Sequence, residues 1–252
     1  MITISDKVIL ITGGAQGIGK TFAFELGKSG AKIALADISQ KVEETASETR
    51  SNGIECVGIR ADISNEEDVK RMVEQTVREY GRVDALVNNA ALFSGLVEKP
   101  FYDITVEEWD KVMAVNLRGM FLCCKAVFPQ MKTQGRGKII NISSGTFLRG
   151  VAGLLHYVTS KGGVVGMTRA LSREVGMYNI TVNAIAPGLI VTEAAKTVHK
   201  NSEQFHSVIK QRALGREEVP EDLAGTLIYL CSDASDFVTG QLIAVNGGDN
   251  LH

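Results

Sequence analysis

Short apolar runs alternate with longer amphipathic segments along the whole chain. Seven runs are rich in Val, Ile and Ala, and several are apolar at every position, which is typical of strands covered by helices on both faces. We predict strands at residues 7–12, 32–37, 56–62, 85–90, 138–143, 181–186 and 242–247.

Helical periodicity fills the intervals between these strands. It predicts helices at residues 18–29, 40–52, 66–80, 105–133, 153–176 and 219–231, with Ser39 near the start of the second and Ser64 or Asn65 capping the third. Regular strand–helix alternation predicts parallel strands joined by right-handed crossovers. The expected fold class is therefore α/β, a doubly wound parallel sheet of the Rossmann type.

Length and composition indicate one domain. The 252 residues are 44% hydrophobic and 22% charged, which is ordinary for a single α/β domain. We therefore assign residues 1–252 to a single domain. Within it, residues 188–216 are long, polar and outside the regular alternation, and we expect them to form a lid.

Charge and the N-terminal segment limit the partners of the chain. A formal net charge of −2 gives no general attraction to nucleic acid or to anionic membranes. The N-terminus lacks the basic start and apolar run of a signal peptide, and we expect no membrane-spanning run of ~18 apolar residues. The predicted location is cytoplasmic, with neither nucleic acid nor membrane as a partner.

The four cysteines show no spacing that suggests a metal or redox site. Cys56, Cys123, Cys124 and Cys231 form no CxxC motif and have no paired histidine. We expect them to be buried small hydrophobes, and we predict no metal.

The first predicted strand runs directly into TGGAQGIG, residues 12–19. Gly13, Gly17 and Gly19 would let the backbone turn tightly and approach a pyrophosphate at the N-terminus of the following helix. A tight strand-to-helix turn also needs glycine, so the motif alone leaves both interpretations open.

Asp37 strengthens the nucleotide interpretation. It ends the second predicted strand, where its carboxylate would accept hydrogen bonds from ribose hydroxyls and repel a 2′-phosphate. Gln16 and Ile38 nearby carry no positive charge, so NAD is favoured over NADP; the alternative is a strand-end residue facing water. Asp62 would reach the adenine edge or cap the turn before Ser64.

HYVTSKGG, residues 156–163, places Tyr157 and Lys161 one helical turn apart. An ammonium near a phenol lowers the tyrosine pKa and makes it a usable acid or base. The alternative is a tyrosine at the edge of the core beside a lysine that reaches solvent. Ser144 ends the fifth predicted strand, at the sheet edge where ligands of parallel sheets bind. Together the three side chains could hold and protonate a carbonyl oxygen.

These motifs, in this order, resemble the short-chain dehydrogenase/reductase family over essentially the whole chain. TGGAQGIG is similar to its cofactor turn, NNA (88–90) to the motif that steadies the central strand, and VNLRG to the segment with its catalytic asparagine. PGLIVT (187–192) is similar to its nicotinamide-contacting segment, and GQLIAVNGG (240–248) to its last strand. Two departures are Ala91, where the family usually has glycine, and Asn246, where it usually has aspartate.

The resemblance implies a role for each matched residue. Tyr157 would be the general acid/base, Lys161 would hold the nicotinamide ribose, and Ser144 would hydrogen-bond the substrate oxygen. Asn116 would bind a water that leads from Lys161 to solvent, or would only kink its helix. Residues 1–252 would be a dinucleotide-binding and catalytic domain whose expected cofactor contacts are Gly13, Gln16, Gly17, Ile18, Gly19, Asp37, Ile38, Asp62, Ile63, Asn89, Tyr157, Lys161, Pro187, Gly188, Ile190 and Thr192.

Apolar residues near these motifs favour a cyclic or aromatic alcohol or ketone. Those expected to line the substrate pocket are Phe93, Phe147, Leu148 and Leu155. The basic residues of the lid would either attract an anionic group or form a solvated helix face; they are Lys196, His199, Lys200, His206, Lys210 and Arg212. His156 would face the pocket or pack in the core.

Three functions follow from these observations. The first is an NAD-dependent oxidoreductase for secondary alcohols or ketones, and the second is an NADPH-dependent 3-oxoacyl reductase of the same family. The third is a non-catalytic dinucleotide sensor, which the presence of Asn116, Ser144, Tyr157 and Lys161 disfavours. The resemblance also implies a homotetramer built on the long helices and the last strand.

Overall fold

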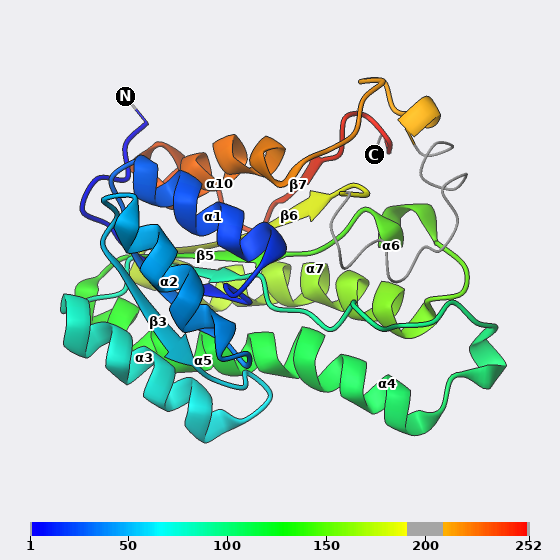
Figure 1. Ribbon diagram of the computed structural model, residues 1–252, viewed down its shortest axis with the longest axis horizontal. Coiled ribbons are helices and arrows are strands. Elements are labelled where there is room, and N and C mark those ends of the chain that lie inside the picture. The colour runs from blue at the N-terminus through cyan, green and yellow to red at the C-terminus, as the bar shows by residue number, and fades with distance from the viewer. Residues whose placement is uncertain (1, 191–208, 251–252) are drawn as a thin grey trace.

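Seven parallel strands form one sheet in the order β3-β2-β1-β4-β5-β6-β7 (Figure 1). The structure is a computed structural model that describes residues 2–190 and 209–250. Every predicted strand is confirmed to within two residues; the strands are β1 Val8–Thr12, β2 Lys32–Asp37, β3 Cys56–Arg60, β4 Ala85–Asn88, β5 Gly137–Ile142, β6 Ile180–Pro187 and β7 Leu242–Val245.

The strand order reverses between β1 and β4, which lie side by side in the middle of the sheet. β1 pairs with β2 from Val8 and Lys32 onward and with β4 from Ile9 and Ala85 onward. The chain therefore leaves β1 toward one edge and crosses back to begin β4 on the other side. A crevice opens at such a reversal, beyond the carboxyl ends of the strands.

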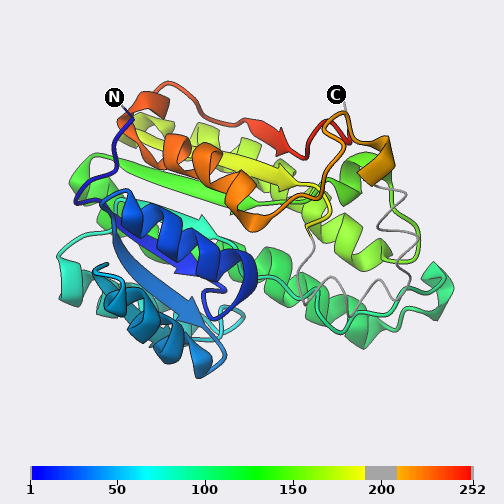
Figure 2. The same cartoon turned by 45° about the horizontal axis from the view of Figure 1, so that its top comes forward.

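Helices cover both faces of the sheet (Figure 2). On one face Phe22 and Leu26 pack in a core with Ile9 and Ile11, and the helices there are α1 Gly17–Lys28, α2 Lys41–Ser51 and α10 Ala224–Cys231. On the other face Met72 and Val127 pack in a core with Leu10 and Leu86, and the helices are α3 Glu66–Tyr80, α5 Met120–Gln134 and α7 Leu155–Val175. Because a hydrophobic core lies on each face of the sheet, the central strands are apolar on both faces.

The cap predicted for α3 and the burial of the cysteines are confirmed, whereas Gln40 and not Ser39 precedes α2, with no side-chain cap. Asn65 caps α3, with its Oδ1 accepting a hydrogen bond from the backbone of Asp68 at 3.0 Å. All four cysteines are free and buried. Burial raises the pKa of Cys56, Cys124 and Cys231 to about 12, so these thiols stay protonated at neutral pH.

Two local features differ from the predicted helices. The segment expected as one helix at 105–133 is α4 Val106–Met113, a π-helical turn Ala114–Gly119 and then α5. A one-turn helix, α6 Thr146–Arg149, lies where no helix was predicted. Single π-turns are frequent at functional sites, and Thr146 and Arg149 of α6 line the cavity described below.

The continuous helical run Val106–Gln134 contains an 18-residue window with a mean hydropathy of 1.4, so by length and composition it is apolar enough to cross a membrane. The expectation that no segment reaches this limit was therefore wrong. Its apolar residues have a use within the fold, because Cys123, Val127 and Met131 are buried in the second core. Core helices pass the same test.

A chain of buried amide hydrogen bonds fixes α7 to the centre of the sheet. The side chain of Asn88 on β4 donates to Asn141 on β5 at 2.9 Å, and Asn141 donates to the Thr168 hydroxyl on α7 at 2.9 Å. All three side chains are buried. Because α7 also carries Tyr157 and Lys161, this chain of bonds positions the site.

Asn141→Ala should lower the free energy of unfolding by about 2 kcal/mol, because it leaves the Asn88 amide and the Thr168 hydroxyl without their buried partner. Urea denaturation of the wild-type protein and the variant measures this loss. Asn52→Ala, at an exposed asparagine, is the matched control and should change stability by less than about 0.5 kcal/mol. An equal effect of the two substitutions would contradict the proposed role of the buried amide.

Candidate active site

A cavity of about 1050 Å³ lies along the carboxyl ends of the central strands. Its wall is made by the glycine turn after β1, the ends of β2, β4, β5 and β6, and the first turns of α7. This is the edge at which the sequence analysis placed the ligand. The lining residues expected from the sequence are Gly13, Gln16, Gly17, Ile18, Gly19, Asp37, Asn89, Phe93, Ser144, Tyr157, Lys161, Pro187, Gly188 and Ile190.

The glycine turn needs glycine at its key positions. Gly13 and Gly17 have φ of +70° and +56°, in the left-handed region that glycine tolerates best. A Cβ atom added to Gly19 would lie 2.1 Å from the carbonyl oxygen of Gly13. Asn89 braces the turn, since its Nδ2 donates to the carbonyls of Thr12 at 2.9 Å and Gly13 at 3.0 Å. The N-terminus of α1 is thereby held open toward the cavity, where it suits a pyrophosphate.

Asp37, at the tip of β2, also lines this cavity. Its carboxylate accepts hydrogen bonds from the backbone N–H groups of Ala15 at 3.1 Å and Ser39 at 2.9 Å. Ile38 beside it is exposed. One cation that the sequence analysis did not consider is near: Arg60 pairs opposite Asp37 in the sheet and donates to the Ile38 carbonyl at 3.3 Å.

Asp62 and Ile63 do not line the cavity. The Asp62 carboxylate accepts hydrogen bonds from the backbone N–H of Ser64 at 2.8 Å and from its hydroxyl at 2.7 Å. Ile63 is buried against Gly119. Two roles were considered for Asp62, a contact with the adenine edge and a cap of the turn before Ser64. The structure shows the second, since the carboxylate caps the turn before α3.

Ser144, Tyr157 and Lys161 line the same cavity. Tyr157 and Lys161 are one turn apart on α7, and both are buried. Lys161 Nζ donates to the Ile142 carbonyl at 2.8 Å and lies 5.7 Å from the centre of the Tyr157 ring. The Ser144 hydroxyl hydrogen-bonds the phenol of Tyr157. The three groups surround a point where a substrate oxygen can accept and release a proton.

Burial sets the acidity of both titratable groups. Burial raises the pKa of Tyr157 to about 12, although the hydrogen bond from Ser144 lowers it. Burial also lowers the pKa of Lys161 to about 8. The expected lowering of the tyrosine pKa is therefore wrong. The cost of desolvating a phenolate outweighs the nearby hydrogen bond.

Asn116 lies in the π-helical turn and is fully buried. Its Oδ1 accepts from the Leu92 N–H at 2.6 Å, and its Nδ2 donates to the Leu92 carbonyl at 3.3 Å and to the Ser160 hydroxyl at 3.1 Å. Asn116 therefore ties the loop after β4 to α7. The water link to Lys161 stays a prediction.

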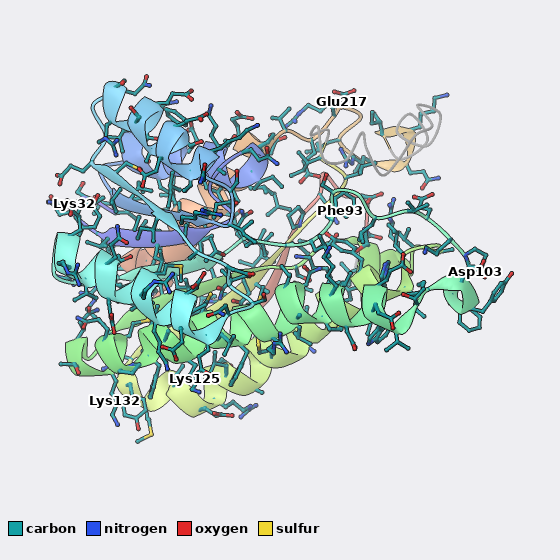
Figure 3. The ribbon with its side chains drawn as sticks, turned by 60° about the horizontal axis from the view of Figure 1, so that its bottom comes forward. Lys32, Phe93, Asp103, Lys125, Lys132 and Glu217 are labelled. Atoms are coloured by element: carbon teal, nitrogen blue, oxygen red, sulfur yellow. The ribbon has the colours of Figure 1, made fainter. Side chains whose placement is uncertain are left out.

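The loop tied by Asn116 carries Phe93, whose ring lies 4.9 Å from that of Tyr157. Figure 3 shows Phe93 on the stretch that leads from β4 to the turn with Asp103. Phe93 lines the cavity as predicted, whereas Phe147, Leu148 and Leu155 do not. His156 is buried and does not line it either, which fits packing in the core.

The end of β6 is held by a buried ion pair. Glu218 accepts from the Gly188 N–H at 3.2 Å, and Arg212 donates to the Leu189 carbonyl at 2.7 Å; the two side chains are 3.4 Å apart. Arg212 is therefore buried in the fold and is not a lid cation facing an anion. Thr192, Lys196, His199, Lys200 and His206 lie outside the described residues.

Four charged residues of the cavity wall were missed: Lys20, Glu98, Arg149 and Asp249. Arg149, at the end of α6, and Asp249 both line the cavity, and Arg149 Nη1 lies 3.3 Å from Asp249 Oδ1. They are 100 residues apart in the chain, so no local pattern connects them. Among residues 2–190 and 209–250, no three His, Cys, Asp or Glu side chains gather to hold a metal.

Comparison with known proteins gives one consistent family. A family model described as enoyl-(acyl carrier protein) reductase matches residues 13–250. The (2S)-[(R)-hydroxy(phenyl)methyl]succinyl-CoA dehydrogenase subunit BbsD of Thauera aromatica is 42% identical over 98% of each chain. The structure of levodione reductase is 33% identical, with a TM-score of 0.91 over 97% of this chain and 98% of that one. The 3-ketoacyl-(acyl-carrier-protein) reductase of Brucella melitensis, complexed with NADH, is 33% identical, with a TM-score of 0.89 over 98% and 99%.

Glu218→Gln should flatten the pH dependence of stability between about pH 4.5 and pH 7. Burial raises the pKa of Glu218 from 4.5 to about 7, with Arg212 opposing the shift. The group therefore contributes its full stability below pH 4.5 and loses it as pH rises through 7, by on the order of 2 kcal/mol. Urea denaturation at several pH values measures the slope. Glu217→Gln, at the exposed neighbour, should leave the slope unchanged; identical slopes in wild type and Glu218→Gln would contradict the assignment.

Proposed function

Because the chain belongs to the short-chain dehydrogenase/reductase family, we propose that it is an NAD-dependent dehydrogenase of secondary alcohols, or reductase of the corresponding ketones, with Tyr157 as general acid/base. The observation that carries this proposal is the convergence of Ser144, Tyr157 and Lys161 in the cavity that begins at the glycine turn. The residues present fit a dinucleotide, since the turn, Asp37 and the end of β6 line one continuous cavity.

The bound cofactor would supply a hydride acceptor at its nicotinamide carbon. Ser144 would hold the substrate oxygen and stabilise the charge that grows on it. In the oxidation direction, Tyr157 would take the hydroxyl proton while the hydrogen on the same carbon leaves as hydride. Lys161 would bind the ribose hydroxyls and favour the phenolate. The backbone at the end of β6, where the Gly188 N–H donates to Glu218, would contact the carboxamide end.

A cyclic or aromatic substrate fits the apolar side of the cavity. The Phe93 ring packs against that of Tyr157 at an interplanar angle of 46°, and Val151 and Ala152 also line the wall. Leu96, Leu154 and Val158 pack behind them. The related subunit from Thauera aromatica is named for a substrate with a hydroxy(phenyl)methyl group, and levodione reductase is also similar to this chain; both support this substrate class.

The carboxylate of Asp37 supports NAD over NADP, because it would repel a 2′-phosphate. The alternative is an NADPH-dependent 3-oxoacyl reductase, and Arg60 beside Ile38 is the observation that favours it. The similar 3-ketoacyl-(acyl-carrier-protein) reductase was solved with NADH, so likeness to that enzyme is compatible with either cofactor. A non-catalytic sensor is the weakest proposal, since the buried proton-transfer groups would then have no use.

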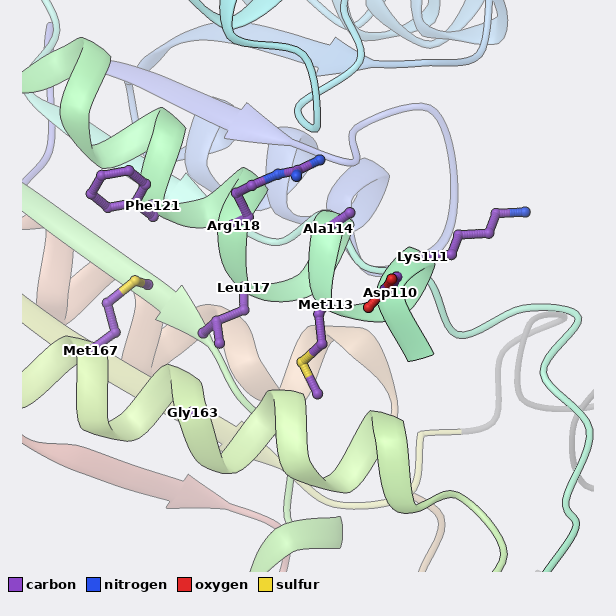
Figure 4. A pocket seen from close by; sticks show the side chains of 9 residues that line it. All are labelled: Asp110, Lys111, Met113, Ala114, Leu117, Arg118, Phe121, Gly163 and Met167. Atoms are coloured by element: carbon purple, nitrogen blue, oxygen red, sulfur yellow. The ribbon is translucent and has the colours of Figure 1, made fainter. Parts of the chain in front are cut away.

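A homotetramer in the cytoplasm completes the proposal. A hollow between the α4–α5 run and α7 is lined by Met113, Leu117, Phe121 and Met167 among others (Figure 4). Phe121 is half exposed there. An apolar surface of this kind suits a second copy of the chain. The only other partner proposed is the small-molecule alcohol or ketone.

Tyr157→Phe should leave NAD binding nearly unchanged while turnover falls by about 10²- to 10⁴-fold, because the ring remains and the proton acceptor is lost. Turnover of 1-phenylethanol with NAD is followed by absorbance of the reduced cofactor, and NAD binding by calorimetry. Tyr102→Phe, at an exposed tyrosine, is the control. A Tyr157→Phe enzyme that kept most of its turnover would rule out this general base.

Asp37→Ala should shift the preference from NAD toward NADP by about 10- to 100-fold, since it removes the repulsion and leaves Arg60 free to meet the phosphate. The measurement is kcat/KM for each cofactor. The double variant Asp37→Ala, Arg60→Gln should lose most of the gain toward NADP. An unchanged preference in Asp37→Ala means that the carboxylate does not contact the ribose.

A further inference from the structure

Arg149 places a positive charge in the wall of the cavity, five residues after Ser144. Its position is fixed by the backbone. Arg149 N–H donates to the Gly145 carbonyl at 3.2 Å, and Gly145 N–H donates to the Pro187 carbonyl on β6 at 2.7 Å. Gly150, with φ of +63°, then ends α6. The arginine is therefore attached to the same sheet edge as the proton-transfer groups.

Arg149 uses only part of its hydrogen-bonding capacity in the contact with Asp249. The Asp249 side chain is 2% exposed; its Oδ1 accepts one N–H of Arg149 at 3.3 Å, and its Oδ2 accepts from Asn250 Nδ2 at 3.3 Å. That distance is long for a charge-assisted bond. In the same protein, Arg216 binds Asp222 through two bonds of 2.6 Å. Among the described residues, the Asp249 bond is the one hydrogen bond of the Arg149 guanidinium, which carries five N–H donors.

The remaining donors of Arg149 are accessible from the cavity. Its side chain is 25% exposed and belongs to the cavity wall. Three carboxylates line the cavity, Asp37, Glu98 and Asp249, beside the three cations Lys20, Arg149 and Lys161, so its overall charge does not attract anions. Recognition of an anion there would depend on the directed N–H fork of the guanidinium, which matches a carboxylate in two parallel bonds.

We propose that Arg149 recognises a carboxylate of the substrate, and that Asp249 orients the guanidinium for this contact. The substrate is then a hydroxy acid with an apolar ring: the ring lies toward Phe93, the hydroxyl lies at Ser144 and Tyr157, and the carboxylate binds Arg149. This inference rests on the proposed dehydrogenase function and narrows its substrate class from neutral alcohols to hydroxy acids.

Kinetics with a matched pair of probes test the contact. The probes are 3-hydroxy-3-phenylpropanoate and its methyl ester, which differ in the negative charge. Wild type should oxidise the acid with a kcat/KM at least about tenfold above that of the ester. Arg149→Gln should lower the value for the acid by about 10- to 100-fold, mainly through KM, and change the value for the ester by less than about threefold. Arg149→Lys should retain an intermediate preference for the acid.

Arg78→Gln is the control, because Arg78 is an exposed arginine on α3. It should change neither substrate's kinetics. If Arg149→Gln lowers kcat/KM equally for the acid and the ester, or if wild type shows no preference for the acid, Arg149 does not bind a carboxylate of the substrate. The dehydrogenase function would still stand in that case.

Binding without turnover separates the two proposals. Calorimetry with 3-phenylpropanoate, which has no hydroxyl to oxidise, should give a Kd at least about tenfold weaker in Arg149→Gln than in wild type. If wild type oxidises none of the alcohols, the dehydrogenase function is wrong and this binding difference alone decides the carboxylate site. Equal binding by the two proteins, or none by wild type, overturns it.

Discussion

The site depends on the burial of a phenol and an amine on one turn of α7. Tyr157 and Lys161 both lie inside the protein, and burial disfavours the charged form of each. Ser144 and the Ile142 carbonyl provide hydrogen bonds that hold the two groups in place. With a tyrosine pKa of about 12, the protein alone keeps the phenol protonated at neutral pH. In the proposed mechanism, proton transfer therefore depends on binding of the cofactor, whose positive ring and ribose hydroxyls would shift this balance toward phenolate.

Much of the surrounding structure serves to keep that turn of helix at the sheet edge. The buried amides of Asn88 and Asn141 connect two central strands to α7. Asn116, in its π-helical turn, connects α7 to the loop with Phe93. The ion pair of Arg212 and Glu218 fixes the backbone after β6. Each network buries polar groups in the interior, and among the described residues Asn88 Oδ1, Arg212 Nε and Glu218 Oε2 have no hydrogen-bond partner.

The sequence predicted the parts of this molecule that depend on local signals. Strand runs, the glycine turn, Asp37 at a strand end and the four-residue spacing of Tyr157 and Lys161 are all encoded within a few residues of one another. The pairing of Arg149 with Asp249 joins residues 100 apart, and it had no sequence signal. The burial of Arg212 and the direction of the tyrosine pKa shift depend on tertiary packing, so spacing alone gave the wrong expectation. The π-helical turn was predicted as part of a regular α-helix, because the hydrophobic repeat of a π-helix differs from that of an α-helix by only about one residue per turn.

The ionisation of Tyr157 is the most direct measure of the proposed chemistry. Phenolate absorbance can be titrated in wild type and in Tyr157→Phe, and the difference between the two curves isolates this one tyrosine. We predict an ionisation near pH 12 for the protein alone and one lower by at least about two pH units when NAD is bound. The same pKa with and without NAD would contradict the account.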